Sequence, residues 1–271
     1  MDRYLRNNQE LWDSKVPCHV KSAFYDVAGF RDGRCTLRPL ELEQVGDVAG
    51  KSLLHLQCHF GLDTLSWARR GARCVGMDFS QKAVDKARSL AEELDIDARF
   101  VCCDVYDLPD HLHGAFDIVF TSYGVLCWLP DVARWADVVA HFLNPGGFFY
   151  VVDGHPMQTV FCNERDAQGL DVRYSYFHRA EPDRWEPDGS YADRSAVLRN
   201  PSYEWQHSLS DIVNALIRAG LRIEFLNEYP FGNYDHFPFA VQREDGWWDL
   251  PEPLTNTIPQ LFSLKAGKPG G

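Results

Sequence analysis

Short apolar segments of strand length alternate with amphipathic segments of helix length along the middle of the chain. In the helical segments, apolar residues recur at three- and four-residue spacing, and a turn residue such as Gly71 ends the segment. Because parallel strands need crossover connections, this alternation predicts a parallel sheet with helices on both faces. The strands are expected at 52–56, 73–78, 99–103, 116–122 and 148–153, and the helices at 62–70, 81–94 and 132–143.

End signals support these assignments. Ser80 stands at the N-cap position of helix 81–94, and its hydroxyl suits the free backbone N–H groups of a first turn. The run Asn144-Pro145-Gly146-Gly147 predicts a turn between helix 132–143 and the next strand.

The flanks of this region are less regular. They predict helices at 8–15, 39–45 and 210–219, the last with Ser210 as its cap, and strands at 221–229 and 258–266. Residues 154–206 are rich in Tyr, Trp and Pro, and short antiparallel strands are expected there at 174–177 and 202–205. No repeat and no linker divides the chain, so one domain is expected. Its parts are an N-terminal helical lid (1–50), a cofactor-binding core (51–153), a substrate cap insertion (154–206) and the end of the sheet (207–271).

Composition and charge exclude several classes of protein. The 271 residues are 45% hydrophobic, yet no apolar run approaches the roughly 20 residues of a membrane span, and the N-terminus does not resemble a signal peptide. The net charge of −12 and the scattered basic residues argue against nucleic acid partners. Eight cysteines without a CxxC pair, and histidines without ligand spacing, indicate reduced cytoplasmic thiols rather than disulfides or a metal site.

Three positions at strand ends suggest a ligand. In an open parallel sheet, ligands bind beyond the carboxyl ends of the strands. Gly61 closes the loop after the first strand, and Asp78 ends the second strand 17 residues later. A carboxylate at this position commonly accepts hydrogen bonds from ribose hydroxyls. Asp104 follows the third strand, where it can accept from an adenine amine. Together these residues predict a ligand that contains adenosine.

The stretch 51–153 resembles the class I S-adenosylmethionine-dependent methyltransferases. Asp78 stands at the ribose position of that family, and Asp104 and Val105 stand at its adenine position. Further matches are the strand Phe116-Asp117-Ile118-Val119 and the turn Leu143-Asn144-Pro145-Gly146-Gly147. The family's first loop, an acidic residue followed by Gly-x-Gly-x-Gly, is altered here. The acidic position is His55, the first two glycines are Gln57 and His59, and only Gly61 remains.

The resemblance implies an α/β, Rossmann-like doubly wound fold. Its sheet would have seven mostly parallel strands and an antiparallel last strand. It also implies S-adenosyl-L-methionine as methyl donor and S-adenosyl-L-homocysteine as product, with the methionine end of the cofactor over Gly61. In related proteins an aromatic residue near the N-terminus closes over the cofactor. The cofactor-binding residues expected on this basis are Trp12, Gln57, His59, Gly61, Asp63, Asp78, Phe79, Asp104, Val105 and Ser122.

Candidates for the lid and for catalysis follow from position. Trp12 shares the lid role with Phe24 and Tyr25, and each of these rings could equally pack a helix onto the sheet. Catalytic groups are expected after the fourth and fifth strands and in the cap. They are His155 as first choice for a general base, because imidazole titrates near neutral pH, with Tyr123 and His236 as further candidates.

The acceptor is expected to be a small molecule, and the aromatic insertion favours an aromatic or apolar one, bound by a monomer or a homodimer. The insertion could instead form an oligomer contact. Two other functions stay open: an NAD-dependent oxidoreductase, whose GxGxxG loop the bulky 57–61 segment does not match, and a binding protein of the same fold that has lost methyl transfer.

Overall fold

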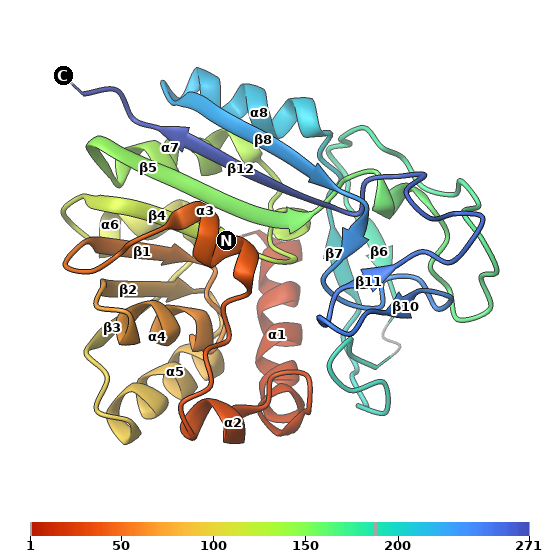
Figure 1. The fold of residues 1–271 in the computed structure, drawn as a ribbon, viewed down its shortest axis with the longest axis horizontal. Coiled ribbons are helices and arrows are strands. Elements are labelled where there is room, and N and C mark those ends of the chain that lie inside the picture. The colour runs from red at the N-terminus through yellow and green to blue at the C-terminus, as the bar shows by residue number, and fades with distance from the viewer. Residues whose placement is uncertain (1, 187–188, 271) are drawn as a thin grey trace.

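The computed structural model describes residues 2–186 and 189–270, which form a central sheet with helices on both faces (Figure 1). The strand order is β3-β2-β1-β4-β5-β12-β8, and β12 runs antiparallel to both of its neighbours. This confirms the seven-stranded, mostly parallel sheet expected from the sequence. The strands are β1 (Ser52–Leu56), β2 (Arg73–Asp78), β3 (Ala98–Cys102), β4 (Phe116–Ser122), β5 (Leu143–Gly154), β8 (Arg222–Tyr229) and β12 (Leu261–Gly267).

Alternate residues of each strand face two separate layers of core. Leu53 of β1 and Phe120 of β4 pack under one layer, and Leu54 of β1 packs under the other. The first layer contains α3 (Pro39–Val45), α4 (Leu62–Arg69) and α5 (Gln81–Glu93). The second contains α6 (Leu108–His111), α7 (Val132–His141) and α8 (Leu209–Arg218). The predicted helices of the core are therefore present within one or two residues of their expected ends.

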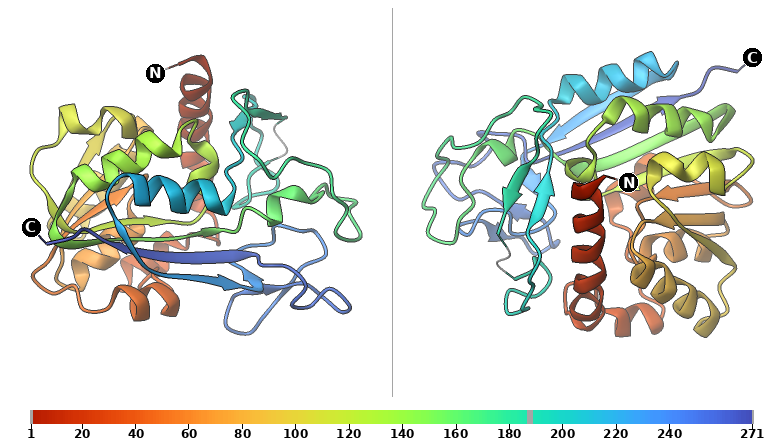
Figure 2. Two further views of the ribbon diagram at one scale, coloured as in Figure 1. Left: turned by 90° about the horizontal axis from the view of Figure 1, so that it is seen from above. Right: turned by 180° about the vertical axis from the view of Figure 1, so that it is seen from behind.

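The helix α1 (Arg3–Lys21) stands across the carboxyl ends of the strands, followed by the short α2 (Val27–Arg31) (Figures 1 and 2). On its far side lies the insertion, whose strands β6 (Asp183–Trp185) and β7 (Ser202–Glu204) pair antiparallel. The Asn8 side chain bonds the Tyr203 backbone twice: its Nδ2 donates to the carbonyl at 2.6 Å, and its Oδ1 accepts from the N–H at 2.9 Å. The insertion is therefore held to the N-terminal helix.

Four local predictions were wrong. The predicted strand 174–177 is irregular, because Tyr174 packs against Trp185 and the Tyr176 hydroxyl accepts from the Leu209 N–H. The predicted turn at Asn144-Pro145-Gly146-Gly147 lies inside β5, beside a register shift in the pairing with β4. Ser208 rather than Ser210 caps α8, because it forms a reciprocal capping box with Asp211. The first helix is longer than 8–15 and runs through Pro17.

Short elements complete the fold. They are the 3₁₀ turns η1 (Val105–Asp107), η2 (Leu126–Trp128) and η3 (Gln158–Val160), and a small sheet of β9 (Phe231–Gly232), β10 (Val241–Gln242) and β11 (Trp248–Asp249) that the sequence did not predict. Within the described residues, no helix combines the length and apolar character that crossing a membrane requires. The division into lid, core and insertion stays a prediction.

Candidate active site

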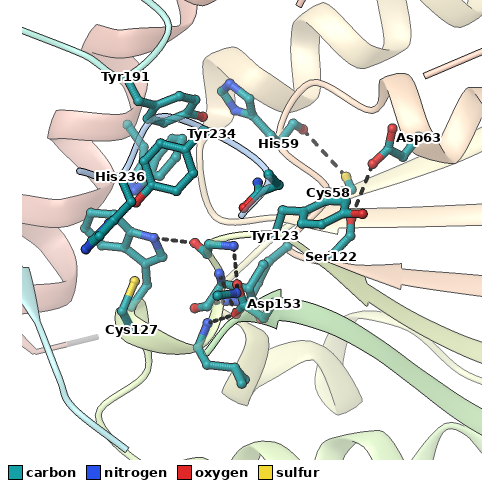
Figure 3. A pocket seen from close by; sticks show the side chains of 18 of the residues that line it. Cys58, His59, Asp63, Ser122, Tyr123, Cys127, Asp153, Tyr191, Tyr234 and His236 are labelled. Carbon is teal, nitrogen blue, oxygen red and sulfur yellow. Dashed lines mark hydrogen bonds between the residues drawn. The ribbon is translucent and has the colours of Figure 1, made fainter. Parts of the chain in front are cut away.

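A cavity of about 970 Å³ lies beyond the carboxyl ends of the strands, between the sheet, α1 and the insertion. All ten residues expected to bind the cofactor line it, and so do Tyr123 and His236 (Figure 3). Residues separated by more than two hundred positions, such as Trp12 and His236, thus share one space. The structure does not bring His155 to the cavity wall.

His155 is held in the core beside the site. Its side chain is 3% exposed, its Nδ1 accepts from the Met157 N–H at 3.0 Å, and its Nε2 lies 2.9 Å from a carboxylate oxygen of Glu228. Both ring nitrogens therefore face protein groups away from the cavity. The imidazole has a structural position here rather than access to an acceptor.

The loop after β1 keeps a glycine-like backbone without the glycines. Gln57 and His59 have φ of 56° and 51°, a left-handed conformation that side chains disfavour by roughly 1–2 kcal/mol each. Asp78 holds the second of these residues in place, because its Oδ2 accepts from the His59 N–H at 2.8 Å. The altered residues thus follow the same kind of path that glycine would adopt freely. Strain retained at a strand-end loop is typical of a functional site.

The packing of the core requires glycine at position 61. Its φ is 80°, and a Cβ at this position would lie 2.7 Å from the Phe100 ring. The same ring would lie 2.8 Å from a Cβ at Gly76 of β2. Phe100 thus packs where two glycines leave room. Gly61 also lines the cavity, and the expectation that it lets a ligand cross the loop stays a prediction.

Two carboxylates mark adjacent strand ends, as expected. Asp78 is 6% exposed and accepts from the backbone N–H groups of His59 and Ser80. Asp104 is 9% exposed and accepts from the Tyr106 N–H at 3.1 Å. Burial raises the pKa of both carboxyl groups, and that of Asp78 reaches about 6. Each carboxylate oxygen has a further lone pair for a ligand hydroxyl or amine.

The pKa of Asp78 predicts how cofactor affinity depends on pH. Ribose hydroxyls need the charged, accepting form of this carboxylate, so affinity for S-adenosylhomocysteine should be constant above pH about 6 and fall as pH decreases through that value. An ordinary aspartate would stay charged to about pH 4. Titration calorimetry on both sides of the pKa measures the effect. The Asp78→Asn variant, which has no proton to gain, should lose the pH dependence; equal dependence in both proteins would contradict the assignment.

A third carboxylate, Asp63, faces the cavity from the first turn of α4 (Figure 3). It accepts from the Thr36 hydroxyl at 2.6 Å and from the Ser122 hydroxyl at 3.3 Å. Burial raises its pKa, and no cation of the described residues lies within ion-pair distance of it. His55, at the family's acidic position, is instead buried with its Nδ1 2.9 Å from the Thr64 hydroxyl. The carboxylate near this loop is thus on the helix α4 rather than at the end of β1.

Several polar atoms of the wall have no partner among the described residues. They are Trp12 Nε1, Gln57 Oε1 and His59 Nδ1, each buried at the atom. Such atoms cost free energy unless a ligand or water satisfies them. Together with three carboxylates, they offer donors and acceptors for an adenosine, an amino group and a carboxylate. The residues present therefore fit S-adenosylmethionine.

The opposite part of the cavity is aromatic. Tyr123 follows β4 with φ of 45°, and its buried hydroxyl lies beside the carboxyl group of Glu41. The Tyr234 hydroxyl lies 2.8 Å from Nδ1 of His236, and the Gln158 backbone stabilises the protonated form of the same ring. Burial lowers the pKa of His236 to about 4, so the ring is neutral near pH 7. Asp153 does not reach this space as a free base, since it accepts from the N–H groups of Val125 and Leu126.

Sequence reasoning missed four lining or supporting residues: Lys15, His19, Tyr191 and Glu204. The hydroxyls of Tyr25 and Tyr191 are hydrogen-bonded to each other, which connects the N-terminal segment to the insertion. Nδ1 of His19 lies 2.9 Å from Nε2 of His59. A helical spacing signal was present, because Trp12, Lys15 and His19 occupy one stripe of α1. Nothing in the sequence marked Tyr191 or Glu204, which reach the cavity only through tertiary folding.

Comparison with known proteins agrees with this geometry. The family model described as "Methyltransferase domain" matches residues 54–151. A ubiquinone biosynthesis O-methyltransferase from Alkalilimnicola ehrlichii is 28% identical in an alignment 194 residues long, which covers 64% of this chain and 78% of that protein. In other relatives of the same name the match spans 50–60% of their length. Among solved structures, an S-adenosylmethionine dependent methyltransferase from Mesorhizobium loti has a TM-score of 0.55 and 23% identity, over 88% of this chain and all of that one.

The fold alone does not separate catalytic chemistries. The [4+2]-cyclase SpnF has a TM-score of 0.60 at 19% identity, over 97% of this chain and 96% of that one, and it is described by a different reaction. The family model and the sequence relatives make the distinction, since both are methyltransferases. They also favour methyl transfer over the NAD-dependent alternative. Residues 54–151 are therefore a methyltransferase domain, and the enzyme is an S-adenosylmethionine-dependent methyltransferase, with S-adenosylmethionine as methyl donor and S-adenosylhomocysteine as product.

Proposed function

We propose that this enzyme methylates a small molecule that binds between the sheet and the insertion. The observation that carries the proposal is the single cavity of about 970 Å³, in which the cofactor-binding residues and the aromatic side chains of the insertion face one another. When donor and acceptor are held together in one space, they react as if at high local concentration. This proximity can lower the activation free energy by roughly 7–11 kcal/mol. The name of the relatives favours oxygen as the methylated atom, and the Tyr and Trp lining favours an aromatic or apolar acceptor.

At the donor end, the roles follow the strand ends. Asp78 accepts from the ribose hydroxyls, and Asp104 accepts from the adenine amine. Asp63, hydrogen-bonded to Ser122, takes the amino group of the methionine part. The remaining members of this set contact the cofactor through the backbone or the side chain: Trp12, Gln57, His59, Gly61, Phe79 and Val105. When bound, S-adenosylmethionine supplies an electrophilic methyl group, and the protein supplies orientation and exclusion of water.

At the acceptor end, His236 is the proposed general base and Tyr234 its positioning residue. If the Nδ1–H donates to the Tyr234 hydroxyl oxygen, Nε2 carries the lone pair that takes the proton that the acceptor loses, and the Gln158 backbone stabilises the protonated ring. The lowered pKa of His236 keeps the ring in this accepting form across the neutral range. Tyr123, on the same wall, contributes a hydroxyl that orients the acceptor.

The His236→Ala variant tests this role. Turnover should fall about 10²- to 10⁴-fold, the usual contribution of a general base, while the dissociation constant of S-adenosylhomocysteine stays the same. The exposed His111 lies outside the cavity and provides the matched control, His111→Ala. Unchanged turnover in a folded His236→Ala protein would leave this histidine a packing residue.

The function as a whole is tested with isotopically labelled S-adenosylmethionine and cell extract. A small molecule that gains the labelled methyl group only with active enzyme supports the proposal. Tight cofactor binding without any labelled product would favour the alternative of a binding protein that has lost methyl transfer. We place the reaction in the cytoplasm on the cysteine pattern of the sequence. A monomer or homodimer is expected, and gel filtration distinguishes the two.

A further inference from the structure

Lys15 is a buried cation in the cavity wall. It projects from the middle of α1, is 9% exposed, and places its Nζ 4.6 Å from the ring centroid of Trp12 and 5.3 Å from that of Trp128. Trp128 belongs to the turn η2 after β4, and Trp12 touches it edge to face at 5.3 Å. The ammonium group thus lies against two indole rings that face the interior of the site.

No carboxylate of the described residues lies within ion-pair distance of Lys15, and its nitrogen has no described hydrogen-bond acceptor. The other cations of the wall are engaged. Arg34 lies 3.1 Å from Asp26, Arg194 lies 3.3 Å from Asp235, and Arg38 donates to backbone carbonyls. Lys15 therefore differs from every other cation of the described cavity wall.

Glu204 of β7 faces the same cavity without pairing with Lys15. Its Oε1 accepts from the Ser202 hydroxyl at 2.8 Å, and the attraction between the two charges is long-range. Burial lowers the pKa of Lys15 and raises that of Glu204, so each group lacks the solvation or contact that would stabilise its charge. Indole contacts offset only part of the cost of burying an ammonium group.

We propose that Lys15 binds a carboxylate of the methyl acceptor, while Glu204 accepts a hydrogen bond from a donor group of the same molecule. A single ammonium on an aromatic wall matches the single charge of a carboxylate, whereas a phosphate would need more donors. Lys15 lies against Trp128 of η2 and attracts Glu204 of β7, which favours the acceptor as the source of the carboxylate. The cofactor has a carboxylate too, so it is the other source of the same chemistry. The inference rests on the proposed methylation of a small molecule.

The Lys15→Met variant removes the charge and keeps the length of the side chain. The labelled product should carry a carboxylate and be retained on an anion exchanger. Lys15→Met should raise the KM for that acceptor about 10- to 100-fold with little change in kcat, and Lys15→Arg should recover most of the loss. Lys21→Met, an exposed lysine of the same helix, is the matched control. A product without an anionic group, or an unchanged KM in Lys15→Met, overturns the inference.

Cofactor binding separates the two sources of the carboxylate. S-adenosylhomocysteine has the amino acid group and 5′-methylthioadenosine lacks it. If Lys15 serves the acceptor, Lys15→Met binds both as wild type does. Weaker binding of S-adenosylhomocysteine alone would assign Lys15 to the cofactor and overturn the acceptor assignment. The thermal midpoint of Lys15→Met should equal or exceed that of wild type, because an unpaired buried charge is lost; a lower midpoint would indicate a structural lysine.

Failure of the proposed function gives a different result. If the wild-type enzyme forms no labelled product, the proposed methyl transfer is wrong. The carboxylate site is then tested by binding alone, with benzoate and benzamide as probes. Benzoate, the charged probe, should raise the thermal midpoint of the wild type saturated with S-adenosylhomocysteine but not that of Lys15→Met. Benzamide should affect neither protein. Equal shifts with both probes, or no shift with benzoate, overturn the carboxylate site.

Discussion

Gly61→Ala is expected to destabilise the protein by about 2–5 kcal/mol, the largest effect on stability of any single change considered. Alanine disfavours the left-handed backbone conformation that residue 61 adopts at φ of 80°. Its Cβ would also lie 2.7 Å from the Phe100 ring. That ring is 4% exposed and packs among α4, α5 and β3, so it has little room to move. Denaturant unfolding followed by circular dichroism measures the loss.

The matched control is Gly146→Ala. Gly146 has the same φ of 80°, and nothing lies within 4 Å of a Cβ built there. This variant should therefore show the backbone penalty alone, about 1–2 kcal/mol. Adding Phe100→Leu to Gly61→Ala should recover part of the difference by relieving the contact. Equal losses in the two alanine variants would mean that Phe100 does not set the need for glycine at position 61.

Asp78→Ala is expected to weaken S-adenosylhomocysteine binding by about 10- to 150-fold, which corresponds to one buried charge-assisted hydrogen bond of about 1.5–3 kcal/mol. The carboxylate acts twice. It is placed to accept from the ligand, and its Oδ2 also fixes the strained His59 turn through the 2.8 Å bond to the backbone N–H. Losing that bond should loosen the loop that the cofactor crosses. Titration calorimetry of the purified variant gives the affinity directly.

Asp97→Ala provides the comparison for this variant. Asp97 is exposed just before β3 and does not line the cavity, so its removal should leave the affinity within experimental error of wild type. Circular dichroism checks that Asp78→Ala remains folded. A folded Asp78→Ala protein with wild-type affinity would remove Asp78 from the binding site and would weaken the case for adenosine recognition at the strand ends.

The core of the fold could be predicted from local patterns. The strands β2 and β4 were predicted to the residue, because apolar segments bounded by turn and polar residues need no long-range information. The aromatic segment 174–177 shows the limit of this reasoning. Its composition is typical of a strand, but Tyr174 packs against Trp185 and no partner strand is present among the described residues around it.

The donor end of the site was predictable for the same reason. Asp78 and Asp104 follow strands, and the carboxyl ends of parallel strands meet at one edge. The acceptor end was not, because it is assembled from α1, the insertion and the segment around His236, which are distant in sequence. His155 follows β5 as a catalytic residue often does. Only its contacts with Met157 and Glu228 reveal that it turns away from the cavity.

The bonds between α1 and the insertion join two walls of the cavity. Asn8 holds the Tyr203 backbone near one end of the helix, and His19 lies 2.6 Å from the Ser190 hydroxyl near the other. The helix therefore cannot separate from the insertion without breaking bonds near both of its ends. The donor-side and acceptor-side walls of the cavity are coupled through these bonds.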